Sequence, residues 1–296
     1  MKNISVIGSG TMGNGIAHVF AQFGYQVSLV DISQQKLDSG MLTIGKNLDR
    51  QVKKKTITPE EKFEILGRID TYLRVSEGVR GADIVIEAAT ENWDIKQELF
   101  KELDSHAPPD AILASNTSSI SITKIAAVTA RPEKVIGMHF MNPVPIMPLI
   151  EVISGYRTST QVLNEVIELG KSIGKDPVEI NDYPGFAANR ILMPMINEAI
   201  ISLQEGVASV KSIDAVMKLG MAHPMGPLQL ADFIGLDVCL SILNVLYEGF
   251  GNPKYAPSPL LINMVQAGFL GVKTGEGFYA YSKDSKEAVV SPRFKN

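Results

Sequence analysis

The chain has 296 residues, of which 20% are charged and 45% hydrophobic, as in an ordinary globular protein. This length accommodates two domains, and the formal net charge of −4 argues against general nucleic-acid binding. The single cysteine, Cys239, excludes an internal disulfide, and its apolar flanks predict a buried thiol. No apolar run reaches the ~20 residues that span a bilayer, and we expect no signal peptide before the first strand. We therefore expect a cytoplasmic protein with no membrane partner.

A dinucleotide-binding pattern opens the chain. The run 3–7 predicts a strand, and it leads into the spaced glycines Gly8, Gly10 and Gly13. A helix over 12–23 and a strand over 25–30 follow, and the second strand is followed by Asp31. In such a unit the glycines allow a tight turn, approach of a pyrophosphate and close helix packing. The pyrophosphate would sit on the helix N-terminus, where free N–H groups favour an anion. The acid would bind the adenosine ribose, which favours NAD over NADP because a 2′-phosphate would meet Asp31.

Strands and helices then alternate. The segment from Thr58 to Glu61 forms a predicted capping box, and the basic run from Arg50 to Lys55 lies in a helical insertion. The alternation predicts an α/β Rossmann-type, doubly wound, mostly parallel sheet over residues 1–183. The predicted strands are 3–7, 25–30, 69–74, 83–87, 111–114, 135–140, 149–153 and 178–180.

The pattern changes near Tyr183. We expect an all-α domain over 184–282, which would bind substrate and form a homodimer, and a polar tail over 283–296. The apolar density of the run 228–247 motivates the dimer. The predicted helices of this domain are 189–205, 212–219, 228–247 and 259–267.

His139 is the histidine that the predicted fold places at a site. It lies near the carboxyl end of strand 135–140, at the edge where ligands bind in open α/β sheets. A proline-rich loop follows, and then an apolar strand that contains one carboxylate, Glu151. If these strands are neighbours, the two side chains can face each other, and the carboxylate would fix the imidazole tautomer. A core histidine with an unrelated edge charge is the alternative on spacing alone.

Two further polar groups have similar positions. Residues 115–119, with the sequence Ser-Asn-Thr-Ser-Ser, directly follow a strand and could hold cofactor and substrate oxygens. Asn189 and Arg190 begin the helical domain, from where a side chain can reach back into an interdomain cleft. In both places helix capping is the alternative interpretation.

Together these motifs resemble the L-3-hydroxyacyl-CoA dehydrogenase family, and most closely its short bacterial 3-hydroxybutyryl-CoA dehydrogenases. The resemblance covers nearly the whole chain. Its most specific stretches are Ser-Asn-Thr-Ser at 115–118 and Gly-Met-His-Phe-Met-Asn-Pro at 137–143. Further matches are Pro-Gly-Phe at 184–186, His-Pro-Met-Gly-Pro at 223–227 and the segment 271–279.

The resemblance implies a role for each matching residue. His139 would be the catalytic base, Glu151 would orient it, and Ser118 and Asn189 would bind the substrate. Asn142 would line the site, and Arg50 and Lys54 would contact the nucleotide of coenzyme A. NAD would be held by Gly8, Gly10, Thr11, Met12, Gly13, Asp31, Glu91, Lys96 and Asn116. No metal site is expected.

The implied reaction interconverts (S)-3-hydroxyacyl-CoA and 3-ketoacyl-CoA, with 3-hydroxybutyryl-CoA as the expected substrate. His139 would take the hydroxyl proton while a hydride passes to NAD. Two alternatives stay open. A β-hydroxyacid dehydrogenase of another substrate class shares the two-domain plan but typically uses a lysine, and a crystallin-like relative would be non-catalytic.

Overall fold

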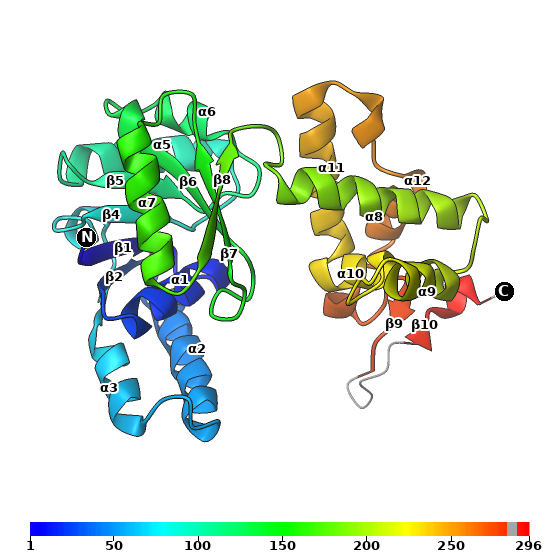
Figure 1. Cartoon of the computed structure of the whole chain (residues 1–296), viewed down its shortest axis with the longest axis horizontal. Helices are drawn as coiled ribbons and strands as arrows, with labels where there is room; N and C mark the ends of the chain where they lie inside the picture. Colours follow the sequence, from blue (N-terminus) through cyan, green and yellow to red (C-terminus); the bar gives the residue numbers. More distant parts are fainter. Residues whose placement is uncertain (283–288, 296) are drawn as a thin grey trace. The chain divides into compact units, whose positions relative to one another are not determined.

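The protein is described by a computed structural model, which covers residues 1–282 and 289–295. The chain divides into two compact units, Met1–Tyr183 and Pro184–Asn296, and each is built around its own hydrophobic core (Figure 1).

The first unit is built on one eight-stranded sheet in the order β3-β2-β1-β4-β5-β6-β7-β8. All neighbouring strands are parallel except β6 and β7, which are antiparallel. This confirms the predicted Rossmann-type, mostly parallel sheet. The strands are β1 (Asn3–Ile7), β2 (Gln26–Val30), β3 (Ile69–Tyr72), β4 (Ile84–Glu87), β5 (Ile112–Ser115), β6 (Val135–Phe140), β7 (Leu149–Ser154) and β8 (Asp176–Asn181).

The two faces of the sheet differ in polarity. On one face, strand residues such as Val6, Leu29 and Ile136 pack with helices α1, α2 and α7 in a single apolar core. Because side chains alternate along a strand, residues such as Ser5 and His139 belong to the opposite face. The helices of this unit are α1 (Thr11–Gln22), α2 (Gln34–Lys53), α3 (Pro59–Gly67), α4 (Val75–Gly78), α5 (Trp93–His106), α6 (Ile122–Ala126), the 3₁₀ turn η1 (Pro132–Lys134) and α7 (Thr160–Ser172).

Local signals explain where several of these helices begin. The predicted capping box is confirmed at α3, where the Glu61 amide donates to the Thr58 hydroxyl at 3.2 Å and the Thr58 amide donates to Glu61 at 2.6 Å.

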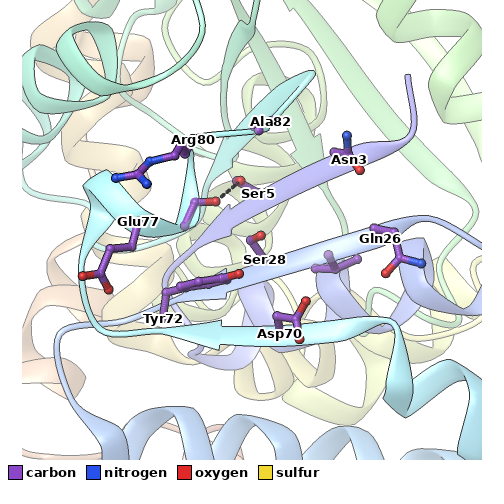
Figure 2. A pocket seen from close by; sticks show the side chains of 12 residues that line it. Asn3, Ser5, Gln26, Ser28, Asp70, Tyr72, Glu77, Arg80 and Ala82 are labelled. Atoms are coloured by element: carbon purple, nitrogen blue, oxygen red, sulfur yellow. Dashed lines mark hydrogen bonds between the residues drawn. The ribbon is translucent and has the colours of Figure 1, made fainter.

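Helix α4 has only four residues and leaves part of the sheet uncovered. A polar hollow of about 700 Å³ lies there, lined by Ser5, Ser28 and Tyr72 among others (Figure 2).

The second unit is helical, and one predicted helix in it is wrong. The run 228–247 forms two helices, because Gly235 between them adopts a φ of +101°, which other residues rarely adopt. Cys239 is fully buried as predicted. The helices are α8 (Ala188–Gln204), α9 (Val210–Gly220), α10 (Pro227–Ile234), α11 (Leu236–Phe250), η2 (Pro253–Tyr255), α12 (Pro259–Gln266) and η3 (Val272–Thr274).

The expectation of a polar tail over 283–296 is wrong for residues 289–295, the part of this segment that the structure describes. Residues 289–295 form structure instead: β10 (Val289–Val290) pairs antiparallel with β9 (Tyr279–Ala280), and the turn η4 (Pro292–Phe294) follows. The ring of Phe294 lies 5.7 Å from that of Phe278. The apolar side chains of this segment therefore complete the helical core, whereas residues 283–288 and 296 lie outside the described part of the chain.

Across the described residues no single helix has the length and composition to cross a membrane. Helices α10 and α11 meet both criteria only when they are counted together, and their axes differ by 97°.

His18 gives the first unit a pH-dependent stability. It lies on α1, is fully buried, and its Nε2 is 3.3 Å from the Gln51 amide nitrogen of α2. Burial lowers the pKa of His18 to about 4. Below the unfolded pKa of about 6.5 only the unfolded chain binds this proton, so the free energy of unfolding falls as pH drops from 6.5 toward 4.

We predict that this effect removes about 2 kcal/mol of stability between pH 7 and pH 5. Urea unfolding of wild type and His18→Leu at both pH values measures it, because the variant lacks the titrating group. His106→Gln is the control, since His106 is exposed on α5. An identical pH dependence in wild type and His18→Leu contradicts the prediction.

Candidate active site

The glycine loop between β1 and α1 is shaped for close approach of a ligand. A Cβ on Gly13 would lie 1.7 Å from the Gly8 carbonyl oxygen, so only glycine lets the helix pack here. Gly8 has a φ of +98°. At Gly10 the same Cβ would meet nothing within 4 Å, so the space above the backbone is open. No side chain caps α1, which leaves the N-terminal end of the helix for an anion.

Asp31 lines a hollow next to the glycine loop. One carboxylate oxygen, Oδ2, accepts hydrogen bonds from the Ser9 amide at 2.8 Å and the Ser9 hydroxyl at 2.9 Å. The other oxygen lies 3.9 Å from Nζ of Lys36, whose side chain is 63% exposed. The hollow measures about 1200 Å³ and is lined by residues of the glycine loop, Asp31 and residues along the length of α5 (Trp93–His106). These residues fit a dinucleotide laid across the carboxyl ends of β1 and β2.

A buried ion pair closes the carboxyl end of β4. Glu87 and Lys96 are 1% and 2% exposed, and Nζ of Lys96 lies 2.5 Å from Glu87 Oε2. Glu87 also accepts the Ser115 hydroxyl at 2.7 Å and the Ala89 amide at 2.9 Å. Desolvated charges need such additional hydrogen bonds to be tolerated. Lys96 is thus held by a carboxylate that the sequence analysis missed.

Glu91 accepts hydrogen bonds from the polar residues that follow β5. Its Oε1 accepts the hydroxyl of Thr117 at 2.7 Å, the Ser118 amide at 2.9 Å and the Ser119 hydroxyl at 2.8 Å. The Ser118 hydroxyl also donates to it at 3.1 Å. Burial raises the pKa of Glu91, but these donors and Lys96, 4.0 Å away, outweigh burial and lower it. Glu91 is therefore a carboxylate that orients Ser118.

His139 and Glu151 meet across the antiparallel pair β6–β7. They are directly opposed in the register, and His139 Nδ1 lies 2.8 Å from Glu151 Oε2. The two residues are 9% and 2% exposed. With Nδ1–H donating to the carboxylate, the other ring nitrogen, Nε2, is left as the acceptor in the neutral imidazole. This is the arrangement of a general base with its orienting acid.

Two asparagines flank this pair. The side-chain oxygen of Asn116 accepts the Phe140 backbone amide at 2.9 Å, and the Asn116 backbone amide donates to the Glu87 carbonyl at 2.7 Å, so Asn116 joins the ends of β4 and β6. Asn142 lies in the β6–β7 loop and lines a hollow of about 430 Å³ with Gly10, Thr11 and residues of α2.

The structure brings most of the predicted site residues to one edge of the sheet. Arg50 and Lys54 lie apart from it, at the C-terminal end of α2, and Asn189 belongs to the second unit, in the first turn of α8. The missed residue Glu87 had the same signal as Glu151, a lone carboxylate in an apolar strand. Among the described residues no group of three or more His, Cys, Asp or Glu side chains could hold a metal ion.

Comparison with known proteins agrees with this geometry. Residues 3–183 match the NAD binding domain of 3-hydroxyacyl-CoA dehydrogenase, and residues 185–281 match its C-terminal domain. The 3-hydroxybutyryl-CoA dehydrogenase of Bradyrhizobium diazoefficiens is 53% identical over 95% of this chain and 96% of its own. A probable 3-hydroxybutyryl-CoA dehydrogenase of Bacillus subtilis is 53% identical over 96% of this chain and 98% of its own.

A solved structure gives the same result for the fold. The (S)-3-hydroxybutyryl-CoA dehydrogenase of Ralstonia eutropha superposes with a TM-score of 0.93 at 50% identity, covering 96% of this chain and all of that one. The match extends over both domains, and the glycine loop, Asp31 and the hollow beside them fit the cofactor of the matched domain. The chain belongs to the NAD-binding 3-hydroxyacyl-CoA dehydrogenase family.

Proposed function

We propose that the protein interconverts (S)-3-hydroxybutyryl-CoA and acetoacetyl-CoA with NAD, and that His139 moves the proton. The observation that carries this proposal is the 2.8 Å contact between His139 and Glu151 at the carboxyl edge of the sheet. The names of the relatives from Bradyrhizobium diazoefficiens and Ralstonia eutropha support the substrate and its configuration.

The proton chemistry follows from the tautomer. Nε2 of His139 accepts the proton of the substrate 3-hydroxyl, and the Glu151 carboxylate stabilises the imidazolium that forms. The glycine loop and Asp31 would hold NAD, which would supply the hydride acceptor for the oxidation at C3. The Ser118 hydroxyl, whose one proton goes to Glu91 in the free protein, turns to donate that proton to the substrate oxygen, and the amides of Asn142 and Asn189 complete the substrate contacts.

We predict that His139→Gln lowers kcat for acetoacetyl-CoA reduction by about 10²–10⁴-fold, because a glutamine cannot exchange the proton. Steady-state turnover with NADH measures the loss, and circular dichroism checks that the variant folds. His106→Gln, which alters an exposed histidine, is the matched control. Wild-type turnover in His139→Gln would sink the assignment.

We further propose that α2 binds coenzyme A. Ser39, Thr43 and Asn47 recur every four residues and line the hollow that contains Asn142. Arg50 continues this side of the helix, where its guanidinium lies 3.3 Å from the Asn47 side chain, and Lys54 follows at the helix end. Figure 1 shows α2 extending away from the sheet with α3 beside it. A polar path with a basic end suits the pantetheine arm and its phosphorylated nucleotide.

The double substitution Arg50→Gln/Lys54→Gln should raise KM for acetoacetyl-CoA about tenfold at low salt, since it removes two charges near the nucleotide. The KM for a truncated acetoacetyl thioester without the nucleotide should not change. Lys62→Gln is the control, because it removes a charge from α3 instead. Equal KM values for acetoacetyl-CoA in the double variant and wild type would indicate that Arg50 and Lys54 lie on a solvated face of the helix and do not contact coenzyme A.

We propose a preference for NAD over NADP, set by Asp31. Ser9 holds one oxygen of this carboxylate, which keeps it at the end of β2. A 2′-phosphate ~4 Å away would be repelled by up to about 4 kcal/mol at an effective dielectric of 20. Lys36, 3.9 Å from the other oxygen, reduces this repulsion.

The expected ratio of kcat/KM for NADH over NADPH is therefore more than tenfold without complete exclusion of NADPH. Asp31→Ala should narrow the ratio, and Lys36→Gln should widen it, because Lys36 offsets the acid. Both are measured with acetoacetyl-CoA at saturation. A ratio at or below one in the wild type defeats the proposal.

We propose that the helical unit forms a homodimer. The run that first suggested this, 228–247, is largely buried in the core of its own unit. Large apolar side chains are exposed instead on and after α9: Val216 at 60%, Leu219 at 87% and Met221 at 61%, with Val207 at 72% just before the helix. An apolar patch of this kind on a globular unit marks an interaction surface.

Light scattering at micromolar concentration should give twice the chain mass. Val216→Glu/Leu219→Glu should shift the protein toward the monomer, because two charges would be buried in the interface. Tyr156→Glu, at a residue 93% exposed in the first unit, serves as the control. A wild-type monomer at this concentration refutes the dimer.

A further inference from the structure

The loop that joins β6 to β7 has few anchors of its own. It covers residues 141–148, follows His139 directly and ends just before the strand of Glu151. Asn142, Ile146 and Met147 are exposed, and Val144 is the only residue of the loop that is fully buried. Within the loop, the amides of Ile146 and Met147 both donate to the Pro143 carbonyl, at 2.9 and 3.0 Å. This turn gives the loop a shape but does not attach it to the sheet.

One anchor is apolar. Val144 packs against α1 at Gly15, where an added Cβ would lie only 2.9 Å from the Val144 Cβ. The contact brings the loop close to the helix that begins at the glycine loop. It fixes the loop at one point.

The second anchor is the ammonium group of Lys175. This residue lies between α7 and β8 and is 8% exposed. Its Nζ donates to the carbonyl of Val144 at 2.6 Å and to that of Met147 at 2.8 Å. Its backbone is itself fixed, because the Lys175 amide donates to Gly170 at 3.1 Å and the next amide donates to Pro148 at 2.9 Å. Lys175 therefore ties the loop, at Val144 and at Met147, to the start of β8.

The charge of Lys175 is balanced in an unusual way. No carboxylate within the described part of the chain lies within 4.0 Å of its Nζ, so two carbonyl dipoles alone face the cation. Burial lowers the pKa of Lys175. A buried cation without an ion-pair partner is costly, and an apolar side chain of this length would fill the space at lower cost. A buried lysine at this position is explained if its two hydrogen bonds position the loop for function, at a cost in the stability of the fold.

We propose that Lys175 is a positioning residue that holds the β6–β7 loop, and with it Asn142, in the wall of the acyl-CoA site. This rests on the proposed function, because the hollow lined by Asn142 is assigned there to the substrate. Loss of the two hydrogen bonds frees the loop and weakens acyl-CoA binding. The dinucleotide hollow contains none of the loop residues, and the loop meets the glycine loop only in the hollow that Asn142 shares with Gly10 and Thr11, so NADH binding is expected to change much less than acyl-CoA binding.

The test compares Lys175→Met with Lys171→Met, which changes a side chain on α7 that is 58% exposed and forms an ion pair with Glu168. Lys175→Met should raise KM for acetoacetyl-CoA about tenfold, while the Kd for NADH stays within twofold of wild type. Hydrogen exchange at the Ile146 and Met147 amides should accelerate in the same variant. Lys175→Arg should recover part of the loss, since a guanidinium also donates to two carbonyls. The control should match wild type in every measurement.

A second variant keeps the test decisive if Lys175→Met does not fold. Val144→Ala loosens the other anchor and should give the same pattern, a higher KM with an unchanged Kd for NADH. An unchanged KM in these variants, or an equal loss of NADH binding, overturns the proposal. Wild type that fails to reduce acetoacetyl-CoA overturns the proposed function instead, so the two failures are distinguishable.

Discussion

The hydrogen bond between His139 and Glu151 depends on one reversal of direction in a parallel sheet. Because β7 runs antiparallel to β6, the two residues are opposed in the register and both point to the same face. A parallel neighbour would need a long crossover and would place the carboxylate elsewhere. The reversal is made by a short proline-rich loop, and that loop also supplies Asn142. Removing one partner of a buried pair typically costs about 3–5 kcal/mol, so each residue stabilises the placement of the other.

The face of the sheet that carries His139 and Glu151 also carries Glu87. Glu87, Ser115 and Gly137 form one row across β4, β5 and β6, and His139 lies two residues beyond on the same side. Glu87 holds Lys96, while Glu91 gathers the hydroxyls after β5. The opposite face is apolar and packs with α1, α2 and α7. The sheet thus packs a stable core on its apolar face and carries the charged site on the opposite face.

Sequence reasoning succeeded where a signal was local. Glycine spacing, the capping box and a lone carboxylate in an apolar strand predicted the first unit and the facing of His139 and Glu151. It failed where the conformation of one glycine or the path of a distant loop decides the structure. Gly235 interrupts an apolar run that reads as one helix, and the bonds of Lys175 to a loop 28 residues away follow only from the path of that loop. Family membership decides against another β-hydroxyacid dehydrogenase, since both domains match the 3-hydroxyacyl-CoA enzymes.

A comparison of His139→Gln, Glu151→Gln and the double variant probes how these two side chains are coupled in catalysis. Glu151 acts on the reaction through His139, which it orients and whose imidazolium it stabilises, so the two substitutions remove one catalytic unit. In steady-state turnover with acetoacetyl-CoA and NADH, each single variant should lose kcat, and the double variant should lose no more than His139→Gln alone. A loss in the double variant equal to the product of the two single losses would show that Glu151 contributes independently of His139, and the pair would then not be the catalytic unit.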